Sequence, residues 1–349
     1  MKKRTNVLLL ILSFIILMVS CKKDIRRLEE DIRKFLGFEK PVHFPEPAYH
    51  FDTNPVTEAG FKLGRKLFYE PRLSRNNTVS CGSCHIQSSG FTHHGHDVSH
   101  GIDDRLGRRN APPIMNLAWH GTFNLDGGVF DLDLQPVVPI TTFEEMDETL
   151  DNVLEKLRAH PEYPSMFREA FGSPEITTAT LLKALSQFMV MCISSNSRYD
   201  SVMRNEAVFT ATEQAGYTIF QHKCASCHKE PLFTDISYRN NGIGIGFNGD
   251  PGRYGVTLDE SDRYKFKVPS LRNLKYTAPY MHDGRFYTLD AVLDKYAGSM
   301  TYVQNIDPLL DKGNGQYGIE LSAEERVQLK AFLNTLNDEH FVRNKLLAE

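Results

Sequence analysis

The sequence carries one short motif twice, as Cys81-Gly-Ser-Cys84-His85 and as Cys224-Ala-Ser-Cys227-His228. Two cysteines separated by two residues and followed at once by histidine form the attachment pattern of c-type haem. Each thiol can add to a haem vinyl group, and the histidine can bind the iron. Zinc is the alternative, but the long separation of the pairs and the histidine after each favour haem. The sequence predicts two covalently bound haem c groups, with proximal ligands His85 and His228.

The surroundings of the two motifs also repeat. Before the motifs stand Gly64-Arg-Lys-Leu67-Phe68 and Gly216-Tyr-Thr-Ile219-Phe220, and after them stand Pro112, Asn116, Leu117 and Asp126-Gly127 in one copy and Pro269, Asn273, Leu274 and Asp283-Gly284 in the other. The spacings from Pro to Asn and from Asn to Asp agree between the copies. The first copy has an insertion before its motif, with Pro71 to Asn77, which we expect to be a loop. Such self-similarity predicts two haem domains related by internal duplication.

Helical spacing of apolar residues covers five further segments, several of which begin with Ser or Thr as a cap. They are residues 149–159, 178–193, 212–221, 289–296 and 322–336. Ser322 and Glu325 form the pattern of a capping box. Residues 240–255 are rich in Gly, Pro and Asn and predict a long loop. The expected fold is mainly α, with two cytochrome c-like haem domains and long loops, at residues 55–205 and 206–349.

The N-terminus has the pattern of an export signal. Lys2, Lys3 and Arg4 precede an apolar run over residues 7–19, which is shorter than the about 20 residues of a transmembrane helix. We expect residues 1–20 to be a signal peptide. Ser20-Cys21 resembles the lipidation site of bacterial lipoproteins, so Cys21 is the predicted lipid anchor and residues 21–54 a linker. The chain would then reside in the bacterial envelope or periplasm, held at a membrane surface.

Charge and the remaining cysteine narrow the function classes. The 40 Lys and Arg residues against 44 Asp and Glu, with no long basic run after the N-terminus, exclude an electrostatic surface for nucleic acid. Cys192 stands alone in an apolar helical segment and is expected to be a buried, inert thiol.

From about residue 55 to 340 the chain resembles the bacterial di-haem cytochrome c peroxidases and the related di-haem maturase of methylamine dehydrogenase. The motifs that carry this resemblance are Leu67-Phe68, Cys81 to His85, Arg109-Asn110-Ala-Pro112, Gln135 with Glu145-Met146, Ser197-Arg-Tyr-Asp200, Leu232-Phe-Thr-Asp235 and Thr277-Ala-Pro-Tyr-Met-His-Asp-Gly284. The resemblance implies that peroxide reacts at the N-terminal haem. It also implies that electrons enter at the C-terminal haem from a small donor of the cytochrome c or cupredoxin type, and it is compatible with a homodimer.

Peroxide cleavage requires a group that moves a proton between the two oxygens. The resemblance assigns this acid/base role to Glu145, with Gln135 as a hydrogen-bonding residue that orients the reacting groups. Glu144 is the alternative carboxyl group. Without the resemblance, both glutamates would be interpreted as a solvated acidic turn.

Two further side chains are candidate distal iron ligands. His100 follows His85 by fifteen residues, where the peroxidases carry a histidine that closes the first iron until the second haem is reduced. Alternatively it belongs to a polar loop with His93, His94 and His96. Tyr296 stands where the family holds the distal ligand of the second iron; Met281 and Met300 are rivals.

The inter-haem position and a cation site complete the resemblance. The family commonly has Trp directly before its Asp-Gly, but this chain has Leu125, and its only Trp is Trp119. This difference argues against radical hopping. Asn110, Thr277 and Pro279 match the oxygen ligands of a calcium ion in the family.

The predicted function is therefore reduction of H2O2 to water by a di-haem peroxidase. The alternatives are a maturase-like oxidase that acts on a protein or small molecule, which Tyr296 favours and Leu125 disfavours, and a plain electron-transfer lipoprotein.

Overall fold

A computed structural model of the chain describes residues 35, 37–245, 249–298, 300–313 and 315–349. The predicted signal peptide and Cys21 lie outside these residues. Two units are distinguished, Met1–Glu39 and Lys40–Glu349. The described residues of the first unit form neither helix nor strand, and everything below concerns the second.

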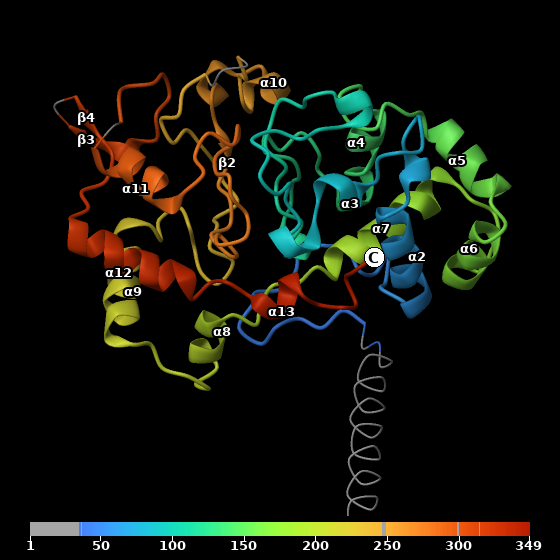
Figure 1. Cartoon of the computed structure of the whole chain (residues 1–349), viewed down its shortest axis with the longest axis horizontal. Helices are drawn as coiled ribbons and strands as arrows, with labels where there is room; N and C mark the ends of the chain where they lie inside the picture. The colour runs from blue at the N-terminus through green and yellow to red at the C-terminus, as the bar shows by residue number, and fades with distance from the viewer. Residues whose placement is uncertain (1–34, 36, 246–248, 299, 314) are drawn as a thin grey trace, which may run out of the picture. The chain divides into compact units, whose positions relative to one another are not determined.

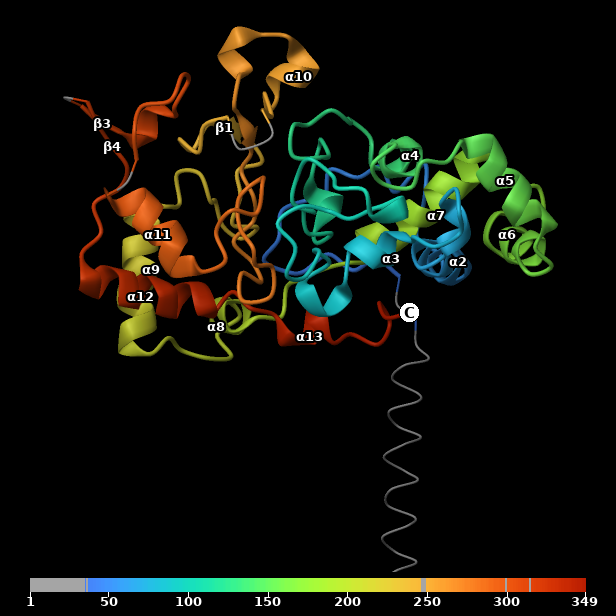
Figure 2. The ribbon, with the colours of Figure 1, turned by 45° about the horizontal axis from the view of Figure 1, so that its top comes forward.

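The second unit is mainly helical, as the sequence predicts, and its described strands form only two short antiparallel pairs (Figures 1 and 2). The helices are α2 (Glu58–Phe68), α3 (Cys81–Cys84), α4 (Val137–Thr141), α5 (Leu150–Ala159), α6 (Tyr163–Phe171), α7 (Thr178–Val190), α8 (Arg198–Met203), α9 (Ala211–Lys223), α10 (Tyr254–Thr257), α11 (Leu289–Gly298), α12 (Ala323–Asn334) and α13 (Glu339–Val342). Strand β1 (Tyr238–Arg239) pairs with β2 (Phe266–Lys267), and β3 (Asp311–Gly313) pairs with β4 (Gln316–Tyr317).

The five helices expected from apolar spacing are all present, as α5, α7, α9, α11 and α12, with ends that differ by a few residues. Their starts follow from capping: the Thr149 side chain accepts a hydrogen bond from Asn152 N, and Ser322 and Glu325 form the predicted capping box. No described helix is both long enough and apolar enough to cross a bilayer.

Two helix pairs pack closely, α2 with α7 and α9 with α12, and they lie on opposite sides of the unit (Figure 1). Each pair makes its close approach at a glycine of the sequence repeat. A methyl group at Gly64 would lie 1.9 Å from the Ala184 carbonyl oxygen, and one at Gly216 would lie 1.9 Å from the Gln328 carbonyl oxygen. Only glycine therefore permits either crossing.

Aromatic side chains fill the core beside each pair. Phe188 of α7 packs against Phe68, with ring centroids 4.8 Å apart, and Phe332 of α12 packs against Phe220 at 5.0 Å. All four side chains are at most 1% exposed. The first haem motif forms α3, and the second directly follows α9 and packs against the Phe220 core.

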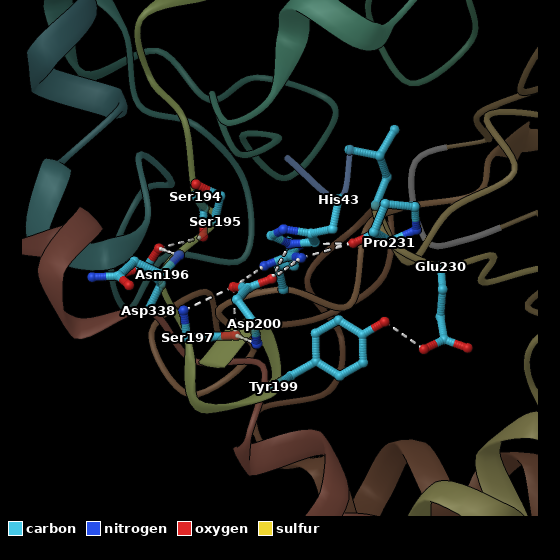
Figure 3. A network of polar contacts seen from close by, with 12 residues as sticks. His43, Ser194, Ser195, Asn196, Ser197, Tyr199, Asp200, Glu230, Pro231 and Asp338 are labelled. Carbon is cyan, nitrogen blue, oxygen red and sulfur yellow. Dashed lines mark hydrogen bonds and ion pairs between the residues drawn. The ribbon is translucent and has the colours of Figure 1, made fainter. Parts of the chain in front are cut away.

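A buried ion pair and its hydrogen bonds join four segments that are distant in the sequence (Figure 3). Asp200 of α8 accepts two hydrogen bonds from the Arg272 guanidinium, at 2.7 and 2.9 Å, and neither side chain is exposed. His43 Nε2 lies 2.7 Å from Asp200 Oδ1, and Arg272 also donates to the Pro231 carbonyl. Burial opposes ionisation of Asp200, but the bonds from Arg272 and His43 outweigh it and hold the pKa of Asp200 well below its usual range.

Candidate functional site

The first motif forms the single helical turn α3, and His85 directly follows it. The His85 Nδ1 lies 2.8 Å from the Phe91 carbonyl oxygen, to which it donates. This hydrogen bond fixes the tautomer and leaves Nε2 for a metal. Burial lowers the pKa of His85, although the carbonyls of Phe91 and Pro112 oppose this, so the ring is neutral and able to bind iron.

The second motif holds its histidine in the same way. The His228 Nδ1 lies 3.1 Å from the Pro269 carbonyl oxygen and 3.3 Å from that of Phe233. Pro112 and Pro269 are equivalent residues of the sequence repeat, and both carbonyls act on the histidine of their own copy. The repeat therefore has a local purpose, which is to orient each imidazole.

The four motif thiols are free of disulfide bonds. Burial raises the pKa of Cys81 to about 12 and that of Cys224 to about 12, so both thiols are protonated at neutral pH. Within the described ranges, no three His, Cys, Asp or Glu side chains are grouped so as to hold a metal ion, which argues against a zinc site built from both pairs. Two uncommitted thiols beside an oriented imidazole fit covalent haem at each motif.

A cavity of about 720 Å³ adjoins the first motif. Its volume lies within the range of about 300–1,000 Å³ that is typical of cofactor pockets. Its lining includes Cys81, Cys84, His85, Gln135, Glu144 and Glu145 from the N-terminal half and Asp250, Pro251, Lys267, Val268 and Pro269 from the C-terminal half. The structure thus brings together the first motif and the predicted catalytic pair.

Glu145 lies on a turn near the motif thiols: burial raises the pKa of Cys81 and Cys84, and the charge of Glu145 adds to this effect. Burial, and then the charge of Glu144, raises the pKa of Glu145 itself. Its carboxyl group makes no hydrogen bond to any described residue and is available to a small molecule in the cavity. A partly buried carboxyl group with a raised pKa can act as both proton acceptor and proton donor.

The turn that carries Glu145 is fixed by two arginines. Arg105 donates to the Phe143 carbonyl at 2.8 Å and to Asp147 at 2.8 Å, and Arg75 pairs with Asp147 at 3.0 Å. These contacts hold the backbone on both sides of Glu145.

Gln135 lies in the same cavity lining, where its Nε2 is 3.4 Å from Asn124 Oδ1. No hydrogen bond joins Gln135 to Glu145 in the described part of the chain. The two side chains line the same cavity without a direct contact through a hydrogen bond.

The His100 side chain contacts other polar residues of its own loop. Its Nδ1 pairs with Asp104 at 2.9 Å, and its ring centroid lies 4.4 Å from that of His96 and 5.8 Å from that of His93. Its backbone carbonyl accepts from the Cys84 thiol at 3.3 Å. The neighbours Ser99 and Gly101 line the cavity and the His100 side chain does not, so its role as a distal ligand stays a prediction.

Tyr296, near the end of α11, lies by the second motif. Its hydroxyl accepts from the Asn241 side chain at 3.4 Å, and the same amide nitrogen lies 3.3 Å from Met281 Sδ. Burial raises the pKa of Tyr296 to about 12, an effect opposed by Asn241 and reinforced by Cys227 and Cys224. Tyr296 and its rival Met281 therefore share one hydrogen-bond donor, and Tyr296 is close enough to interact with the motif thiols.

The predicted calcium ligands can be followed in part. Asn110 donates from its side-chain nitrogen to the carbonyls of His96 and Asp97, at 3.1 and 3.0 Å, and its backbone N donates to the His282 carbonyl at 2.7 Å. Its side-chain oxygen makes no hydrogen bond with any described residue. Thr277 is buried, and Pro279 follows it by two residues.

Other predicted features have clear places. Cys192 is fully buried, and burial raises its pKa, as expected of an inert thiol. Trp119 donates from its indole nitrogen to the Pro45 carbonyl and is not in the cavity lining, whereas Leu125 is.

Sequence reasoning missed the charged wall of the cavity. Arg109 binds Asp250 through two hydrogen bonds, of 2.6 and 2.9 Å, and Asp126 through one of 2.5 Å. Lys267, buried in β2, lies on the same lining. The only sequence signal for a buried charge at this position was a lysine between Phe266 and Val268. Because lysine side chains are usually solvated, this signal alone does not predict burial.

Comparison with known proteins agrees with this geometry. Residues 58–208 match the model of the family described as di-haem cytochrome c peroxidase. The methylamine utilization protein MauG of Methylorubrum extorquens is 36% identical over 84% of this chain and 83% of its own length. The cytochrome c551 peroxidase of Nitrosomonas europaea is 32% identical over 79% of each chain.

Solved structures lead to the same family. A MauG-like protein associated with microbial copper homeostasis superposes with a TM-score of 0.81 at 33% identity, over 90% of this chain and 99% of that one. The fold also matches the diheme peroxidase BthA of Burkholderia thailandensis, with a TM-score of 0.73 at 20% identity, over 85% of this chain and 91% of that one. The chain therefore belongs to the di-haem cytochrome c peroxidase family and is an oxidoreductase of that type.

Proposed function

We propose that the chain reduces H2O2 to water at the His85 site, with two electrons that enter at the His228 site from a small redox donor of the cytochrome c or cupredoxin type. The observation that carries the proposal is the shared cavity, whose lining includes His85, Gln135 and Glu145. Haem bound through Cys81, Cys84 and His85 supplies the redox-active iron. The overall reaction consumes one H2O2, two electrons and two protons and yields two water molecules.

The chain's own residues manage the protons. The Glu145 carboxylate accepts a proton from the peroxide oxygen that lies nearer the His85 site. It then returns this proton to the other oxygen, which leaves as water when the O–O bond breaks. Its raised pKa makes both halves of this transfer accessible. Gln135, as a neutral donor on the same lining, orients the peroxide without competing for the proton.

The second haem site relays electrons to the first. We propose Tyr296 as its distal ligand, supported by the interaction of Tyr296 with Cys227 and Cys224. A phenolate ligand stabilises Fe(III). His100 remains the proposed gating ligand of the first iron, and Asn110, Thr277 and Pro279 remain the proposed calcium ligands.

We further propose that the two haem domains, 55–205 and 206–349, arose by duplication. The equivalent glycine crossings of Gly64 and Gly216 and the paired carbonyls of Pro112 and Pro269 support this origin. The export signal and Cys21 support a lipid-anchored protein of the periplasm, and a homodimer is compatible with the family.

A maturase-like oxidase is the second candidate. The position of Tyr296 and the sequence identity of 36% to MauG of Methylorubrum extorquens favour this function, whereas Leu125 at the inter-haem position disfavours it. A plain electron-transfer protein is the third candidate, and it would keep both irons six-coordinate and low-spin. A high-spin N-terminal haem that appears on half-reduction would instead favour the peroxidase.

The test is a matched pair of glutamine variants. Glu145→Gln should retain both haems and lose most peroxide turnover, because it removes the proton acceptor. Glu144→Gln, on the same lining, should retain most of it. Turnover is measured from half-reduced protein with a reduced small cytochrome. Equal activity in wild type and Glu145→Gln would refute the assignment.

A further inference from the structure

Lys267 belongs to a stretch of chain that contributes to both haem sites. Its side chain is 8% exposed and lines the His85 cavity, and its backbone N donates to the Leu125 carbonyl at 2.7 Å. Two residues further along, the Pro269 carbonyl accepts the hydrogen bond of His228. One short stretch of chain therefore forms the wall of the first site and orients the imidazole of the second.

The ammonium group of Lys267 is incompletely satisfied. It can donate three hydrogen bonds, but it makes only one within the described part of the chain, to the Thr122 carbonyl. The rings of Phe123 and Tyr238 lie 5.8 and 6.0 Å away. Burying a charge without an anionic partner is costly, and burial accordingly lowers the pKa of Lys267 to about 8.

The nearby carboxylates are already engaged. Asp126, whose charge acts on Lys267, is bound to Arg109, and so is Asp250. Arg253 and His120 add no negative charge; the Arg253 guanidinium instead repels the ammonium group. Among the described residues Lys267 has no ion-pair partner, and an anionic group in the cavity would compensate its charge.

We propose that Lys267 binds a propionate carboxylate of the haem at His85 and that its positive charge raises the reduction potential of that haem. The proposal rests on the proposed haem at this site. Haem brings two carboxylates, and an ammonium group in a low-dielectric wall is a strong partner for one of them. A fixed positive charge near iron favours the reduced state, which carries one positive charge fewer.

The experiment compares three substitutions in the full chain with both haems attached. Lys267→Gln keeps a hydrogen-bond donor for Thr122 but removes the charge, and Lys267→Arg keeps the charge. The matched control is Lys265→Gln, since Lys265 pairs with Asp262 at 3.3 Å and is not in the cavity lining. Spectroelectrochemical titration gives the midpoint potential of each haem.

Lys267→Gln should shift the potential of the His85 haem downward, whereas Lys267→Arg and Lys265→Gln should leave it near that of the wild type. An unchanged potential in Lys267→Gln, or an equal fall in Lys267→Arg, overturns the proposal. Lys267→Met permits the same decision if the Gln variant does not accumulate. Mass spectrometry distinguishes a failure of the Lys267 proposal from a failure of the proposed function. Fewer than two haems attached to the wild type would contradict the proposed function. Two attached haems, with potentials that do not change in Lys267→Gln, would contradict only the role of Lys267.

Discussion

The backbone amide of Ile102 donates a 2.7 Å hydrogen bond to the carbonyl oxygen of Glu145. This bond joins the loop that carries His100 to the turn that carries the proposed acid/base group. Between them Gly101 packs so closely that a methyl group there would lie 2.1 Å from the Glu144 carbonyl oxygen and 2.6 Å from Glu145 Cα. A movement of the His100 loop therefore displaces the backbone of Glu145.

Gly101→Ala should consequently reduce peroxide turnover by about 10- to 100-fold, because displacing a catalytic group by about 1 Å has an effect of this size. Both haems should remain attached. Gly121→Ala is the control, since a methyl group at Gly121 meets no atom within 4 Å. Steady-state turnover of the two variants decides the matter, and wild-type activity in Gly101→Ala would contradict the coupling of loop and turn.

The raised pKa of Glu145 predicts the acid limb of the pH profile. The base must be deprotonated to accept the peroxide proton, so kcat/KM should fall as pH decreases through a pKa above the ordinary carboxyl value of about 4.3. Glu144→Gln removes a charge that raises this pKa and should move the limb to lower pH. A limb that stays in place in Glu144→Gln would show that another group titrates.

Tyr296→Phe should alter the absorption spectrum of the C-terminal haem alone. The pKa of about 12 means that the free hydroxyl is neutral at pH 7, so only binding to a metal would make it a phenolate under these conditions. Tyr302→Phe serves as control, because Tyr302 is 67% exposed. Identical spectra of wild type and Tyr296→Phe would eliminate this ligand and favour Met281 or Met300.

Asp200→Asn should reduce the free energy of unfolding by about 3–5 kcal/mol, since it leaves the buried Arg272 charge without its partner. Arg198→Gln removes a neighbouring but exposed pair with Glu213 and should cost much less. Denaturant unfolding at pH 7 compares them.

The same pair predicts a dependence on pH. The pKa of Asp200 is lowered by folding, so its stabilisation is complete above the unfolded value of about 3.9 and is lost as pH falls toward the lower folded value. The difference between wild type and Asp200→Asn should therefore shrink below about pH 4. A constant difference down to pH 2 would mean that ionisation of Asp200 does not contribute.

The sequence predicted what depends on local spacing. The haem motifs and the five amphipathic helices depend on neighbours along the chain, and so does the capping box of Ser322. It did not predict α4, α6, α8, α10 or α13. All of these except α6 are too brief to show apolar periodicity. Gln135 and Glu145 came from the resemblance, and the cavity brings them together.

The remainder of the site depends on contacts between distant residues. Lys267 meets Thr122 and Asn241 meets Tyr296 only after the chain has folded, and single residues of this kind carry no periodic signal. His100 is a residue for which the sequence position matches the family but the side-chain contacts could not be foreseen. Its side chain pairs with Asp104 and does not line the cavity.

The wall contributed by Asp250, Pro251 and Lys267 has a consequence for any attempt to divide the molecule. A fragment that ended near residue 205 would keep the first attachment motif and Glu145, yet its porphyrin would lack one side of its enclosure. Water would reach the iron from that side and weaken every electrostatic contact within the pocket. The first half is thus not self-sufficient, and its chemistry belongs to the intact polypeptide.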